Sequence, residues 1–244
     1  WEDPLWFRFN AKMEAIYQLP YGRRFEKYLY LLQEGNKDEL KLPIAGYNPM
    51  GKPAVLEKLQ ELMALDAEGI ATKELAAINQ TLANQAEATI QVVLNLADDL
   101  GGAWTNFYTT DYTTKFQISP LVNRHFCTPY FWTSEQPTEA VIRQRVRAAA
   151  FRTLHHLEND APLTLAEHLA NEVFVQSKLS TASETHQKNF SEIAAFYSTH
   201  QASADYNLIF NFFYGDEASE LVGFKTYGRA PKEGFAYAQF LASE

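Results

Sequence analysis

Apolar residues recur along much of this chain in steps of three and four, the spacing that places side chains on one face of an α-helix. The clearest run lies between residues 71 and 97 and ends at a stop signal that contains Gly101-Gly102. At a rise of about 1.5 Å per residue, such a helix is roughly 45 Å long. We therefore predict a long central helix whose apolar stripe is formed by Ala71, Leu75, Ile78, Leu82, Ala86, Ile90, Val93 and Ala97.

Local start and stop signals predict helices on both sides of this run. Asp3-Pro4 and Pro53 are typical of first turns. The stretch Pro137–Glu158 has helical spacing, and Thr164 with Glu167 can form a capping box for the next helix. No long-period repeat and no long polar linker divides the chain. The sequence therefore predicts an all-α (mainly α) fold, a single bundle-like domain of many helices that spans residues 1–244.

Residues 103–136 interrupt the helical pattern. The segment is dense in aromatic residues and threonine, which favour extended structure, and Pro120 and Pro129 exclude a continuous helix. Aromatic and polar side chains alternate around Trp104, Asn106 and Tyr108, which predicts a short strand or hairpin. We therefore expect an irregular aromatic insertion with a short β-element. Long ordered segments of this kind often carry function.

This aromatic segment offers what a small-molecule pocket needs, namely apolar walls with a few polar groups. It leads directly into the helix at Pro137, whose first turn has unpaired N–H groups that favour an anion. Arg143 near that end can bind a carboxylate or phosphate through two hydrogen bonds. We predict a pocket between segment 103–136 and this helix that binds a small polar or anionic molecule. The candidate ligand-binding residues are Trp104, Asn106, Tyr108, Asp111, Arg124, His125, Tyr130, Trp132 and Arg143.

Three alternatives stay open at this point. The aromatic side chains can serve packing alone, and Glu139, four residues before Arg143, can neutralise that arginine without any ligand. The segment can also form a partner or dimer surface in a non-enzymatic interaction or scaffold protein, which is compatible with a homo-oligomer. Whether the protein is an enzyme is not decided by the sequence. His125 is the best candidate acid or base because the unperturbed pKa of histidine lies near neutral pH.

Composition and charge narrow the classes of partner. The formal net charge is -9, with 30 acidic against 21 basic residues, so we expect no nucleic-acid partner. No apolar run approaches the roughly 20 residues of a membrane helix, and we expect no membrane span. Cys127 is the only cysteine, which excludes an internal disulfide and fits a reducing compartment, so we expect a cytoplasmic protein.

The metal and cofactor signals in the sequence are weak. His155 and His156 are adjacent, so their rings point about 100° apart on a helix and do not chelate one ion. His168 and Glu172 lie four residues apart, a spacing that can hold a metal, but we interpret them as a surface pair. No phosphate loop, dinucleotide fingerprint or nucleophile elbow occurs in the chain. We therefore expect no metal and no cofactor.

Overall fold

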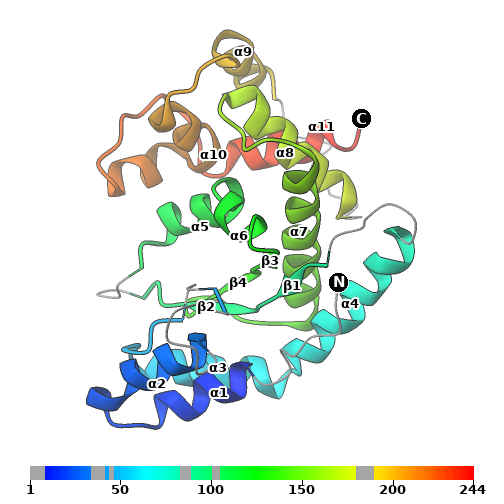
Figure 1. Ribbon diagram of the computed structural model, residues 1–244. Helices are drawn as coiled ribbons and strands as arrows, with labels where there is room; N and C mark the ends of the chain where they lie inside the picture. Colours follow the sequence, from blue (N-terminus) through cyan, green and yellow to red (C-terminus); the bar gives the residue numbers. More distant parts are fainter. Residues whose placement is uncertain (1–8, 34–41, 44–46, 83–88, 101–104, 180–189) are drawn as a thin grey trace. The chain divides into compact units, whose positions relative to one another are not determined.

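The computed structural model describes residues 9–33, 42–43, 47–82, 89–100, 105–179 and 190–244 (Figure 1). Helices dominate this part of the chain, which confirms the predicted mainly-α fold class. The predicted helix start at Asp3-Pro4 and the candidate residue Trp104 lie outside the described residues. No helix in the ranges given is both long enough and apolar enough to cross a bilayer.

The bounds of the elements follow chain order. The helices are α1 (Phe9–Tyr17), α2 (Tyr21–Gln33), α3 (Pro53–Ala64), α4 (Ala67–Leu82), α5 (Phe107–Phe116), α6 (Ser119–Val122), α7 (Glu139–Glu158), α8 (Leu165–Lys178), α9 (Ser191–His200), α10 (Tyr206–Leu221) and α11 (Glu233–Leu241). The strands are β1 (Gln91–Val92), β2 (Asn95–Ala97), β3 (Phe126–Cys127) and β4 (Tyr130–Trp132).

The contacts within the chain divide it into two compact units. Unit 1 comprises Trp1–Phe107 and Pro120–Ala150, and unit 2 comprises Tyr108–Ser119 and Phe151–Glu244. Both α5 and α7 contribute residues to each unit, and the units are described one at a time below. That the whole chain folds as one domain stays a prediction.

Unit 1 combines helices with two short parallel strand pairs. Helix α1 packs against α2 and α3, and α3 packs against α4 (Figure 1). Strand β1 pairs with β3, and β2 pairs with β4 in the register Asn95 to Tyr130 and Ala97 to Trp132. Backbone hydrogen bonds continue between the pairs, since Val93 N–H donates to the carbonyl oxygen of Cys127 at 2.9 Å.

The predicted long central helix is wrong in its second half. The apolar face of the first half is confirmed, because Ala71, Leu75 and Ile78 are buried on α4, but this helix ends at Leu82. Residues 90–97 instead supply β1 and β2, and all of them except the half-buried Gln91 are buried. Parallel strands are covered on both faces and read as continuous apolar runs, which short windows do not distinguish from a buried helix.

The aromatic segment is also more regular than predicted. A short β-element is present, but it consists of β3 and β4. The strand expected around Tyr108 is wrong, because Phe107–Phe116 forms helix α5. Tyr112 and Phe116 lie on the buried face of α5 and pack into an aromatic core, and this burial outweighs the weak helix preference of threonine and tyrosine.

Unit 2 is built around that aromatic core. Helix α11 packs against α8, α9 and α10. The predicted capping box at the start of α8 is confirmed, with the Thr164 side chain accepting from Glu167 N–H and the Glu167 carboxylate accepting from Thr164 N–H. Among the buried members of the core are Tyr112, Phe116, Leu165, Leu169, Phe190, Ile193, Leu208, Ile209, Phe210, Phe212, Phe213, Tyr214, Ala218, Tyr237 and Ala238.

Candidate functional site

Arg143, the central residue of the predicted pocket, is engaged by two carboxylates of unit 1. Its Nη2 donates to Glu139 Oε1 at 2.6 Å, and its Nη1 donates to Glu74 Oε2 at 3.2 Å. Arg147 shares the second carboxylate, donating from Nη1 to Glu74 Oε1 at 2.6 Å. These contacts support the account in which neighbouring glutamates neutralise the arginines of α7.

The other candidate residues of unit 1 differ in exposure. Trp132 is buried in β4, where its ring lies 4.7 Å from that of Phe107. Tyr130 is half-buried, with its ring centroid 6.3 Å from that of Trp132. The remaining three, Asn106, Arg124 and His125, are exposed. Tyr130 and Trp132 are thus two candidate residues that the structure brings together. His125 has a positive φ of 60°, at the turn that precedes β3.

The remaining two candidates, Tyr108 and Asp111, belong to unit 2. Tyr108 packs edge-on against Tyr214, with ring centroids 6.1 Å apart. The Asp111 carboxylate accepts a hydrogen bond from the Lys115 ammonium and another from the Tyr214 hydroxyl at 2.7 Å. Burial lowers the pKa of Lys115, while the Asp111 carboxylate raises it. The pKa of Tyr214 is raised mainly by burial and also by the negative charge of Asp111. Asp111 therefore joins Lys115, another polar residue of the aromatic segment, to Tyr214 of α10.

A second polar group of unit 2 surrounds Glu172, and it corrects the interpretation of Glu172 and His168 as a surface pair. Both side chains are buried. Glu172 pairs with Arg152, and side-chain exposures of 2% and 5% make this a buried ion pair. The second Glu172 oxygen accepts from Gln176 Nε2 at 2.7 Å.

His168 is held in one tautomer by its two partners. Its Nδ1 lies 2.8 Å from the carbonyl oxygen of Thr164, which only accepts, so Nδ1 carries the proton. Its Nε2 therefore accepts from the Tyr112 hydroxyl at 2.9 Å. Burial lowers the pKa of His168, which favours this neutral form.

A second histidine, His156, lies in the last turn of α7. Its pKa is lowered to about 4 by burial and by the neighbouring His155 and Arg152.

Several buried polar side chains of unit 2 pair with one another. Lys115 and Tyr214 share Asp111, Arg152 pairs with Glu172, and Tyr112 bonds to His168. A buried polar network of this kind orients the helices that supply it. Over the described parts of the chain, no three histidine, cysteine, aspartate or glutamate side chains form a group that could hold a metal.

Unit 1 also contains an open groove, which lies between α1 and α2. The turn between these helices is fixed by Arg24, whose Nε donates to the Leu19 carbonyl oxygen at 2.7 Å and whose Nη2 donates to the Tyr17 carbonyl oxygen at 2.5 Å. Carbonyl groups at a helix end have no partner within the helix, so a guanidinium that binds them ties the second helix to the end of the first. The same guanidinium lies 4.2 Å from the centre of the Tyr21 ring. Arg24 thus ties the start of α2 to the end of α1.

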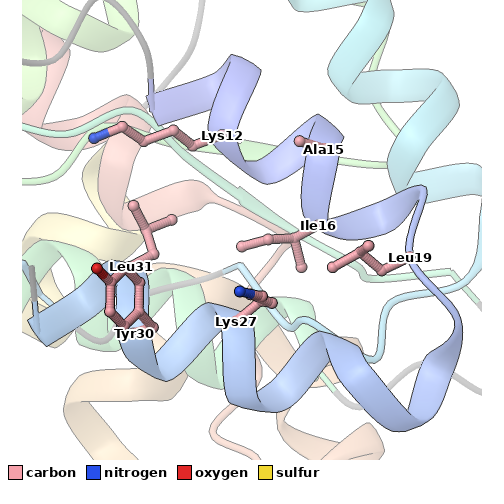
Figure 2. Close-up of a pocket in the computed structure, with 7 residues that line it drawn as sticks. All are labelled: Lys12, Ala15, Ile16, Leu19, Lys27, Tyr30 and Leu31. Atoms are coloured by element: carbon pink, nitrogen blue, oxygen red, sulfur yellow. The ribbon is translucent and has the colours of Figure 1, made fainter. Parts of the chain in front are cut away.

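The α1–α2 groove has a volume of about 550 Å³. Figure 2 shows Ile16 and Leu19 pointing from the α1 side towards α2, while Tyr30 and Leu31 come from α2. The groove is lined by Lys12, Ala15, Ile16, Leu19, Lys27, Tyr30 and Leu31. Its surface is thus mainly aliphatic, with two ammonium groups and one phenol, and none of the lining side chains just named is acidic.

Comparison with protein-family models, with curated proteins and with solved structures finds no match to this chain. The function is therefore inferred from the geometry of the chain alone.

The sequence assigned no ligand-binding role to any residue of the groove. A weak signal was present in α2, where the exposed Lys27 and Tyr30 lie away from the buried residues Tyr28 and Leu32. An exposed aromatic residue on a short helix is a weak indication of a contact surface, because single exposed apolar residues are common. The sequence of α2 alone does not show which element packs beside it, and only the fold identifies α1 as the other side of the groove.

Proposed function

We propose that the protein binds a small amphiphilic molecule in the α1–α2 groove, with the apolar part of the ligand against Ile16, Leu19 and Leu31. The observation that supports this proposal is a groove of about 550 Å³ with a mainly aliphatic surface. Small-molecule sites have volumes of roughly 300–1,000 Å³, mostly apolar walls and few polar groups. We keep the expectation of a small ligand and propose the groove, in place of the aromatic segment, as its site.

The expected affinity of a simple ligand is modest. A chain that buries roughly 200 Å² of apolar surface gains about 5 kcal/mol. Association costs several kcal/mol in lost translational and rotational freedom, and the groove is already formed, so little is spent on ordering the protein. We therefore expect short single-chain ligands to bind weakly, with dissociation constants of roughly 10 mM or more. A natural ligand with more groups that fit the rim binds more tightly.

The proposal is tested by filling the groove. Ala15 is exposed and lines it, so Ala15→Phe places a ring in the space without removing a buried side chain. We expect this variant to keep the fold and to lose at least about tenfold in affinity for octanoate, because an apolar ligand and the ring compete for the same aliphatic surface. Isothermal titration calorimetry measures the affinity, and circular dichroism measures the helix content.

Ala11→Phe is the matched control. Ala11 is an exposed residue of the same helix, one turn earlier, and does not line the groove. The control should bind octanoate as the unchanged protein does. Equal binding by both variants would contradict the proposed function.

A further inference from the structure

Two lysine side chains accompany the aliphatic surface of the α1–α2 groove. Lys12 comes from α1 and Lys27 from α2, and both residues are exposed (Figure 2). The Lys27 ammonium lies 5.8 Å from the centre of the Tyr30 ring, and Tyr30 is 64% exposed. The groove thus joins an apolar surface to ammonium groups supplied by both of its helices.

The charges at this place differ from those of the protein as a whole. The chain carries a formal net charge of -9, yet the seven lining residues carry two positive charges and no negative charge. A lysine ammonium attracts carboxylate and phosphate oxygens and repels cations, while the surrounding negative protein disfavours non-specific anion binding. A head group that ends near Lys12 and Lys27 is therefore anionic.

We propose that the ligand of the groove is a single-chain aliphatic carboxylate, with its chain along Ile16, Leu19 and Leu31 and its carboxylate paired with either Lys27 or Lys12, whose ammonium groups lie apart in Figure 2. This inference rests on the proposed function, since it names the chemical class of the same ligand. One chain suits a groove of this volume, and a lysine ammonium, a compact point charge, can pair with a carboxylate oxygen. The phenol of Tyr30 adds a hydrogen-bond donor at the rim.

The test compares three probes with the same chain length: octanoate, octanol and octylammonium. Exposed ion pairs each contribute up to about fivefold in affinity, so we expect octanoate to bind about five- to tenfold more tightly than octanol at low ionic strength. Octylammonium should bind more weakly than either. The preference for octanoate should shrink in concentrated salt, because the groups are exposed and screened.

Charge removal gives the second arm. The double variant Lys12→Gln/Lys27→Gln should bind octanoate and octanol equally, while its affinity for octanol stays unchanged. The control Lys52→Gln/Lys73→Gln removes the same charge from exposed residues of unit 1 outside the groove and should keep the preference.

The outcomes separate the two proposals. If octanol and octanoate bind equally to the unchanged protein, or octylammonium binds best, the carboxylate inference is overturned and the proposed function stands. If none of the three probes binds, both are overturned. Octanoate preference that is lost in the groove variant and kept in the control supports both.

Discussion

Replacing Glu172 by glutamine should lower the free energy of unfolding by about 3–5 kcal/mol, the usual cost of breaking a buried ion pair by removing one charge. Both side chains of the Arg152–Glu172 pair are almost completely buried. Without the carboxylate, the Arg152 guanidinium stays buried with no opposite charge, and its desolvation is no longer offset by the attraction to Glu172. Urea unfolding followed by circular dichroism measures the loss.

Two controls decide whether burial is the cause. Glu61→Gln breaks the pair between Lys58 and Glu61, whose glutamate is 44% exposed, and should cost no more than about 1 kcal/mol. The double variant Arg152→Met/Glu172→Leu removes both charges and should recover most of the stability lost by Glu172→Gln. A loss below about 1 kcal/mol for Glu172→Gln would show that this pair is not desolvated in the folded protein.

Gly215→Ala should be similarly severe, with a loss of about 3–5 kcal/mol in the free energy of unfolding. Gly215 lies at a kink inside α10, with φ 85° and ψ 179°, a conformation that is essentially restricted to glycine. A Cβ atom at this position would lie 2.7 Å from the carbonyl carbon and oxygen of Ala230. Backbone atoms do not move aside as the end of a flexible side chain does, so the strain adds to the cost of the dihedral angles.

Gly223→Ala separates these two contributions. Gly223 also has a positive φ, 75°, but a Cβ atom there meets nothing within 4 Å. This variant should therefore lose only about 1–2 kcal/mol, the cost of a left-handed conformation for alanine. Equal losses for the two variants, measured by urea unfolding, would mean that the close approach of Ala230 to Gly215 is not maintained.

Local signals in the sequence predicted the elements that depend on local physics. The helix expected at Pro137–Glu158 is α7, and the capping box of Thr164 and Glu167 is formed, because both depend on residues within one or two turns of each other. The aromatic helix α5 also carried a local signal in Tyr108, Tyr112 and Phe116 at steps of four. The preference of aromatic residues and threonine for strands predicted a strand there instead of a helix.

Features that depend on distant residues could not be predicted in this way. Residues 90–97 form strands because Phe126–Cys127 and Tyr130–Trp132 pair with them, and the helical spacing that continued from α4 gave no sign of that pairing. The helical positions of Arg152 and Glu172 assign each to a face of its own helix but do not show that α7 and α8 bury them together. The groove also depends on contacts between different elements, because Arg24 of α2 must bind the end of α1 for the two helices to form it.

The central claim, that the ligand binds between α1 and α2, is tested most directly by nuclear magnetic resonance of methyl-labelled isoleucine and leucine during a titration with octanoate. We predict that the methyl signals of Ile16, Leu19 and Leu31 shift together and saturably, since all three line the groove. The signals of Ile118 and Ile142, which belong to the aromatic segment and to α7, should stay in place. Shifts confined to Ile118 and Ile142, with Ile16, Leu19 and Leu31 unchanged, would contradict this claim and would return the site to the aromatic segment.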